Sequence, residues 1–343
     1  MYFNCKVIQT PLKTKNMKKL SFASMALIAL MGAGFQSCDK KNDETTPLTP
    51  TAQEFNHIRE TALANLKQVF DFQAEDGIAT FISENGVQLS INGNCLTKNG
   101  NPVSGPVKVE FVELFDRSNM LTTNKPTTGK LPDGSEALLI SGGEFYIQAT
   151  QDGQPLALTC GMHLQVPTAL SGGDDWEMEL FKGVIDDEGN LAWERNKQAE
   201  FGIRENQGGA ATGNNYYAIF SSFGWTNVDR FYSDPRPKTT ILVAVPEGYD
   251  AANSAVYLSY DGEPNALALL DTYDAETGLF SEHYGQIPVG LDCHVIFVSE
   301  NNGQWSYAIR GVSIVEGGII TFDENDLATT TESGLTQLIS DLP

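Results

Sequence analysis

The chain has 343 residues, and 22 lysine and arginine residues against 44 aspartate and glutamate residues give it a formal net charge of −22 at pH 7. So negative a protein repels phosphate backbones and anionic lipid headgroups, which argues against nucleic acid as a partner. Hydrophobic residues make up 41% of the chain, which is typical of a globular protein rather than a disordered one. The length is sufficient for about two domains.

The N-terminal segment, residues 1–37, predicts a signal peptide. Two lysines follow Met17, which we interpret as the true start, and an apolar run without any charge extends from Leu20 to Phe35. As a helix this run would span about 24 Å at 1.5 Å per residue, short of the ~30 Å hydrocarbon core of a bilayer. The run therefore indicates a signal peptide rather than a permanent membrane helix.

The end of this segment resembles the lipobox of bacterial lipoproteins, in which the cysteine is acylated and becomes the new N-terminus. It reads Phe35, Gln36, Ser37, Cys38, with Phe35 where the family usually has leucine. The resemblance implies lipidation at Cys38, and two or more acyl chains anchor a protein stably where one does not. The alternative is ordinary secretion with Cys38 as an unmodified thiol.

The charged cluster at 39–44 resembles the export signal that sends lipoproteins of Bacteroidota to the outer leaflet of the outer membrane. It implies a surface-exposed, lipid-anchored protein, with a periplasm-facing anchor as the alternative. Residues 38–53 are rich in threonine, proline and charge, and are expected to form a flexible tether.

Beyond the tether the hydrophobic period changes from helix to strand. Apolar residues at steps of three and four predict a helix over 53–72: Phe55, Ile58, Ala62, Leu66, Val69 and Phe70. From Ile78 the period is two, and short strands alternate with turns containing glycine, asparagine and aspartate. The fold class is therefore mostly β, with antiparallel immunoglobulin-like or similar sandwiches.

The β region is expected to form two domains. The stretch 205–215 has no large side chain and three glycines, so we place a linker at 206–215. The helix and the first sandwich would cover 54–205, and a second sandwich of seven strands would cover 216–325. A C-terminal tail, 326–343, contains a short amphipathic segment.

One stretch in the first half resembles a β-module of uncharacterised lipoproteins of Bacteroidota. The run NGNPVSGPVKVE precedes a segment with the family pattern D-x-x-x-M-L, matched here by Asp116, Met120 and Leu121, with Thr127 at the matching threonine. The resemblance extends over 78–325 and implies the fold and the lineage. It implies no catalytic residues.

The number and spacing of the cysteines and histidines do not indicate a metal site. Cys95 and Cys160 fall in the same expected domain and are the candidate disulfide pair, the alternative being buried free thiols. The four histidines are scattered singly, so no zinc site is expected. Acidic turns at 186–190, 260–264, 274–278 and 323–326 could supply oxygen ligands to calcium, but none has the spacing of an EF-hand, which favours ordinary solvated turns.

Aromatic residues gather between 216 and 232. Trp225 follows a glycine in an expected turn and is the candidate for stacking on a sugar ring, with Asn227, Asp229 and Arg230 as hydrogen-bonding contacts to a sugar or a peptide. The alternative interpretation is that these aromatics belong to a β core.

The sequence contains no nucleophile motif, P-loop or dinucleotide fingerprint. It therefore predicts a non-enzymatic cell-envelope lipoprotein without a cofactor, which binds a glycan, a polypeptide or an envelope partner. The alternative is a secreted hydrolase that acts on glycans through two carboxylates about 5–9.5 Å apart.

Overall fold

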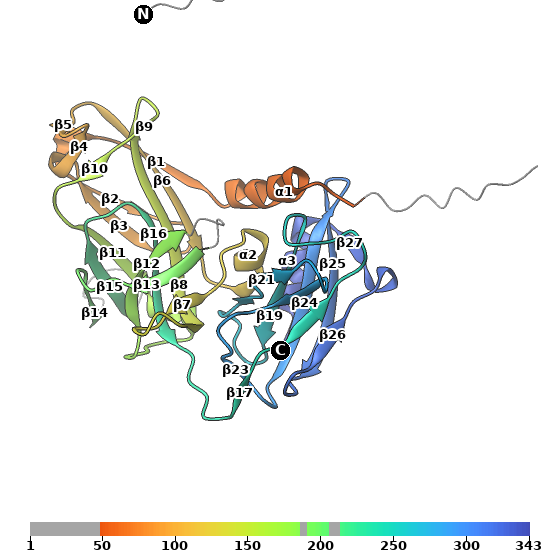
Figure 1. Cartoon of the computed structure of the whole chain (residues 1–343). Coiled ribbons are helices and arrows are strands. Elements are labelled where there is room, and N and C mark those ends of the chain that lie inside the picture. Colours follow the sequence, from red (N-terminus) through yellow and green to blue (C-terminus); the bar gives the residue numbers. More distant parts are fainter. Residues whose placement is uncertain (1–48, 186–190, 206–212) are drawn as a thin grey trace, which may run out of the picture. The chain divides into compact units, whose positions relative to one another are not determined.

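The computed structural model describes residues 49–185, 191–205 and 213–343, and this part of the chain is mostly β (Figure 1). The expected signal peptide, Cys38 and the acidic turn at 186–190 lie outside the described residues. None of the helices in the described ranges has both the length and the apolar character that a membrane crossing requires.

Helix α1 (Ala52–Asn65) is shorter than the sequence predicts. It begins at a capping box, in which the side chain of Thr51 accepts from the backbone N–H of Glu54 and the Glu54 carboxylate accepts from that of Thr51. The expected continuation to residue 72 is wrong, because Val69 and Phe70 lie in a strand that pairs with a distant segment of chain. Strand pairing across the fold overrides the local helical period there.

The first strand set, β1–β16, contains three sheets, coloured orange to green in Figure 1. The eight-stranded sheet has the order β1 (Gln68–Gln73), β6 (Pro106–Leu114), β8 (Glu136–Gln151), β16 (Gly224–Phe231), β12 (Glu179–Ile185), β13 (Leu191–Arg195), β7 (Thr128–Lys130), with β9 (Gln154–Pro155) paired to β8. The five-stranded sheet has the order β14 (Glu200–Glu205), β15 (Asn214–Phe220), β11 (Met162–Pro167), β3 (Gln88–Asn92), β2 (Ile78–Ile82). A small sheet contains β10 (Ala157–Leu158), β4 (Leu96–Lys98) and β5 (Asn101–Pro102).

Strand β7 pairs with β13 on one side and with β8 on the other, so β8, β16, β12, β13 and β7 close into a ring. A separate buried cluster belongs to this ring and contains Leu139, Phe181, Leu191 and Trp193. Gly129 in β7 makes the packing possible, because a Cβ there would lie 2.7 Å from the side chain of Leu139.

The second strand set, β17–β27, also contains three sheets. The five-stranded sheet has the order β20 (Ala268–Leu269), β19 (Ser254–Tyr260), β24 (Asp292–Asn301), β25 (Gln304–Ser313), β27 (Ala328–Thr330). The four-stranded sheet has the order β21 (Thr272–Asp274), β22 (Leu279–Ser281), β18 (Leu242–Ala244), β26 (Ile319–Thr321), and β17 (Lys238–Thr239) pairs with β23 (Ile287–Pro288). Helix α3 (Glu332–Ser340) forms in the amphipathic tail segment, with Leu335 and Ile339 fully buried.

The expected linker at 206–215 is wrong. Strands β14 and β15 on its two sides pair with each other, with Glu205 opposite Asn214, so this stretch connects neighbouring strands of one sheet. Strand β16 also belongs to the first set, since it pairs with β8 and β12. A glycine-rich stretch without large side chains suits a hairpin loop as well as a linker.

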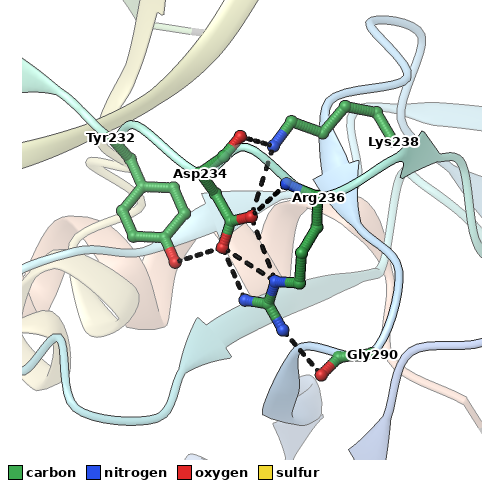
Figure 2. A network of polar contacts seen from close by, with 5 residues as sticks. All are labelled: Tyr232, Asp234, Arg236, Lys238 and Gly290. Carbon is green, nitrogen blue, oxygen red and sulfur yellow. Dashed lines mark hydrogen bonds and ion pairs between the residues drawn. The ribbon is translucent and has the colours of Figure 1, made fainter.

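The chain passes from the first strand set to the second at residues 232–237, where a polar network surrounds Asp234 (Figure 2). Arg236 donates from Nε to both carboxylate oxygens of Asp234 at 3.0 Å and from Nη1 to the carbonyl of Gly290 at 2.7 Å. Tyr232 and Lys238 also donate to Asp234. Hydrogen bonds from Arg236 hold the pKa of the Asp234 carboxyl well below its usual range. The connection is therefore fixed rather than a free linker.

The two strand sets share a buried core, so the expected division into separate domains does not hold. One cluster combines Phe55 of α1, Met120 and Leu121 of α2 (Arg117–Thr122), and Tyr257, Ile296 and Trp305 of the second set. Residues 47–343 form one compact unit.

The residues of the family pattern serve this shared core. The Asp116 carboxylate caps α2 by accepting from the backbone N–H groups of Ser118 and Asn119. Met120 and Leu121 are fully buried, and Thr127 exchanges hydrogen bonds with the backbone of Leu267 in the second set. The pattern is thus structural.

Candidate functional site

Trp225 lies in strand β16 rather than in a turn, and it is half-buried. Its ring centroid lies 5.4 Å from that of Tyr146 and 6.4 Å from that of the fully buried Trp193. The Nζ of Lys125 lies 5.3 Å from the ring. Trp225 therefore packs against the core of the first strand set.

The other three expected contact residues do not form a surface with Trp225. Asn227 and Asp229 are fully buried, which makes their expected role as ligand contacts wrong. Asn227 accepts a hydrogen bond from Ser141 at 2.9 Å and donates to Glu144 at 3.4 Å. Arg230 donates from Nε to the carboxylate of Asp175 at 2.6 Å. Asn227 thus connects β16 to β8, and Arg230 connects β16 to the turn before β12.

The most exposed tryptophan in the described part of the chain is Trp176, which has 75% of its surface accessible. It lies in the turn before β12, although its sequence alternates like a strand. Met178 and Leu180, which follow at the same parity, are buried. An exposed indole offers a large apolar contact area with a polar N–H at its edge.

Trp176 borders a cleft of about 480 Å³ that we call the Trp176 cleft; it is lined by residues 175–180, 195–197, 199 and 201–203. Its apolar side is formed by Met178, Leu180, Phe201 and Ile203, and its polar side chains come from Glu177, Glu179, Arg195, Asn196 and Lys197. The cleft lies between strand β12 of the eight-stranded sheet and β14 of the five-stranded sheet.

The turn that carries Trp176 is held in place from both sides. The backbone N–H of Asp175 donates to the hydroxyl of Tyr216 at 3.0 Å, and that hydroxyl donates to the carbonyl of Gly173 at 3.1 Å. The Asp175 carboxylate forms an ion pair with Arg230 and also accepts from the backbone N–H of Glu177 at 2.9 Å. Burial raises the pKa of Tyr216, so this phenol remains a neutral donor. Trp176 is therefore displayed on a rigid turn.

A second hollow, of about 470 Å³, lies on the five-stranded sheet around His163, Gln165 and Tyr217. The guanidinium of Arg204 lies 3.5 Å from the centre of the Tyr217 ring. The ring also lies against Gly202, where a Cβ would lie 3.0 Å from it. Arg204 thus already occupies one face of the Tyr217 ring.

The acidic turns considered for calcium use their carboxylates within the fold. Asp261 Oδ1 accepts a hydrogen bond from Nδ1 of His294 at 2.7 Å when that nitrogen carries the proton. Asp274 accepts from the backbone N–H groups of Glu276 and Thr277. Asp323 and Asp326 form a capping box. These are the side-chain contacts of ordinary aspartate turns.

The candidate cysteines, Cys95 and Cys160, form a disulfide. It connects the turn before β4 to the segment before β11, across 65 residues of sequence. Cys293 is a buried free thiol, and burial raises its pKa to about 12. It is therefore unsuited to nucleophilic chemistry.

The fold also brings together three residues that spacing in the sequence does not connect. Ligand atoms of Glu136, Asp271 and His283 all lie within 4.8 Å of one another. Asp271 and His283 flank the paired strands β21 and β22, and the packing of the two strand sets brings Glu136 to them.

Comparison with known proteins adds no assignment, because no protein-family model and no curated protein matches the chain.

Proposed function

We propose that this chain is a lipid-anchored, surface-exposed protein of the bacterial outer membrane that binds a carbohydrate in the Trp176 cleft, without catalysing a reaction. In this proposal residues 1–37 are the signal peptide, Cys38 carries the lipid and 39–48 tether the folded body. The two strand sets are two joined β-sandwiches of the lipoprotein family of Bacteroidota that the sequence resembles.

The observation that carries the proposal is the exposed indole of Trp176 on a rigid turn beside a cleft. An indole offers a flat apolar face to the C–H face of a sugar ring, and it loses little conformational entropy on binding because its turn is already fixed. The neighbouring carboxylates, amide and cations, such as Glu177, Asn196 and Lys197, suit sugar hydroxyls as acceptors and donors.

We propose a glycan rather than a peptide as the ligand. A peptide that adds to the free edge of a sheet binds through a row of backbone groups, and β14, which lines one side of the cleft, is an edge strand of its sheet. The indole of Trp176 and the charged and amide side chains of the cleft are instead contacts that suit a sugar ring and its hydroxyls. Binding of a peptide rather than a glycan would contradict the proposal.

We favour a binding function over a hydrolytic one because the carboxylates near the cleft already have structural partners. A glycosidase needs one carboxyl as acid and a second as nucleophile or base. Asp175 is paired with Arg230, and Glu179 is paired with Arg195, so both carboxylates have structural partners. The hydrolase remains the alternative function, and it predicts release of reducing ends from a bound glycan.

The test is a glycan array followed by titration of the retained glycans against the wild type and Trp176→Ala. We expect binding at least about tenfold weaker in Trp176→Ala, since a stacked aromatic at a binding centre contributes at least ~1.4 kcal/mol. Ile78→Ala is the matched control, because Ile78 is 71% exposed and lies away from this cleft. Equal binding by all three proteins would exclude the Trp176 cleft.

Tryptophan fluorescence gives an independent readout. Trp193 and Trp305 are fully buried and Trp225 is half-buried, so acrylamide mainly quenches Trp176. A glycan in the cleft should protect the wild type from quenching. Trp176→Phe should remove the protected component and retain part of the affinity.

A further inference from the structure

Glu136, Asp271 and His283 meet where the two strand sets face each other. Glu136 begins β8 of the first set, whereas Asp271 lies between β20 and β21 and His283 follows β22 of the second. The three residues line a cavity of about 40 Å³ together with Thr128. Such a cavity holds one small ligand, the size of a water molecule or an ion.

One of the side chains that line this cavity, that of Asp271, has a buried oxygen without a hydrogen-bond partner among the described residues. Asp271 contacts the Nδ1 of His283 through Oδ2 at 2.7 Å, but its Oδ1 is buried and has no hydrogen-bond partner among the described residues. A carboxylate oxygen removed from water without a partner is costly. A ligand that binds carboxylate oxygens in the cavity would remove this cost.

Hydrogen bonds of the neighbouring residues Glu282 and Tyr284 stabilise the turn that carries His283. The Oε2 of the buried Glu282 accepts from the backbone N–H groups of Tyr284 at 2.8 Å and Gly285 at 2.7 Å. The hydroxyl of Tyr284 donates to the carbonyl of Leu269 at 2.9 Å. These bonds fix both sides of His283, so its ring is already oriented toward Asp271.

We propose that Glu136, Asp271 and His283 bind one zinc ion. Carboxylate oxygens and imidazole nitrogens both bind zinc, with bonds of about 2.0–2.2 Å, and three protein ligands leave a fourth position for water. Calcium takes oxygen ligands only and usually needs six to eight of them, so the imidazole argues against it. Among divalent metals, zinc binds such mixed sites more tightly than manganese or ferrous iron.

The ion would connect the two strand sets, since one ligand comes from the first set and two come from the second. A ligand that binds only the folded state raises the stability of that state, and here the added bonds span the shared interface. The site is independent of the Trp176 cleft, and either proposal can fail without the other.

The test uses the full chain, stripped of metal with a chelator and then titrated with zinc in competition with a fluorescent zinc indicator. Bound zinc is counted by elemental analysis after desalting. We expect one more zinc per chain in the wild type than in His283→Ala, and at least tenfold weaker binding in Glu136→Gln. Other zinc-binding groups, including the cysteines, are the same in all the proteins. Their contribution therefore cancels in the difference in zinc content between the wild type and a variant.

His57→Ala is the matched control, because His57 is also an exposed histidine and lies on α1, far from this cluster in sequence. Zinc should raise the melting temperature of the wild type and of His57→Ala, but not that of His283→Ala. Far-UV circular dichroism shows whether each variant is folded. If His283→Ala does not fold, the zinc affinity of Glu136→Gln tests the proposal in its place. Equal zinc content in wild type, His283→Ala and Glu136→Gln, or binding of calcium without zinc, would overturn the proposal.

Discussion

Glu144 and Asp229 are fully buried acids on the neighbouring strands β8 and β16. Burial raises the pKa of Glu144 well above its usual range, and the nearby charge of Asp229 raises it further. Burial also raises the pKa of Asp229 well above its usual range. Lys125 lies close enough to oppose the shift of Glu144, and burial lowers its own pKa to about 8. Asp229, which the sequence predicted as a ligand contact, is thus part of the interior.

This pair predicts a stability that falls as pH rises. Above the unfolded-state pKa values, near 4, the unfolded chain loses these protons while the folded chain keeps them, so the unfolded state binds fewer protons. Each acid then lowers the free energy of unfolding by up to about 1.4 kcal/mol per pH unit, until its folded-state pKa is reached. Urea melts between pH 4 and 8 measure this slope.

Asp229→Asn should flatten the slope and stabilise the protein at pH 7, because the amide needs no proton to remain neutral. Glu177→Gln makes the same kind of substitution at an exposed side chain and is the control variant. An unchanged slope in Asp229→Asn would show that Asp229 does not carry the pH dependence.

Two tryptophans should respond oppositely to truncation. Trp176→Ala should change the free energy of unfolding by less than about 0.5 kcal/mol, because its side chain is exposed. Trp225→Ala should cost about 3 kcal/mol, because it removes ring packing against Tyr146 and Trp193. Urea midpoints of the two variants decide this, and a large shift for Trp176→Ala would mean that its ring is packed in solution.

The disulfide should contribute measurably to stability. A bond that closes a loop of 65 residues constrains the unfolded chain by about 4 kcal/mol in the entropy model, and measured gains are often smaller. Cys95→Ala/Cys160→Ala should therefore lower the free energy of unfolding by about 2–4 kcal/mol and remove the sensitivity of the melting temperature to reductant. Cys293→Ala serves as control and should keep that sensitivity.

The shared core predicts cooperative unfolding of the whole folded part. Arg117 of α2 is buried and donates to Ser259 at 2.9 Å and to the carbonyl of Pro343 at 2.9 Å, which ties the first strand set to the second. Residues 216–325 alone should not fold, because β15 and β16 then lack their partner strands. Calorimetry of the full chain should show one transition, and a stable fragment of 216–325 would contradict this.

Lipidation at Cys38 is tested in cells. Cys38→Ala should abolish labelling by a palmitate analogue and release the protein from the membrane fraction, because no acyl chain then holds it there. Cys293→Ala provides the comparison and should be labelled like the wild type. Undiminished labelling of Cys38→Ala would contradict the lipoprotein proposal.

Local patterns in the sequence were sufficient for the class of fold and for several elements. Alternation of apolar residues and turns rich in glycine, asparagine and aspartate predicted a mostly β protein, because both signals depend on neighbours in the chain. The amphipathic tail segment became α3, whose Leu335 and Ile339 are buried. The pairing of Cys95 with Cys160 was the one available within the expected domain.

Tertiary structure alone decided which tryptophan faces water and which residues meet. The sequence around Trp176 alternates like a strand and that around Trp225 predicts a turn, yet Trp176 lies in a turn and Trp225 in β16, where neighbouring strands cover its ring. The composition of the glycine-rich stretch at 206–215 is typical of both a loop and a linker. The pairing of β14 with β15 identifies it as the connection between neighbouring strands. Glu136, Asp271 and His283 converge through contacts between distant segments, and no spacing in the sequence encodes such a contact. Burial and strand pairing are properties of the whole chain, whereas periodicity and turn chemistry are local.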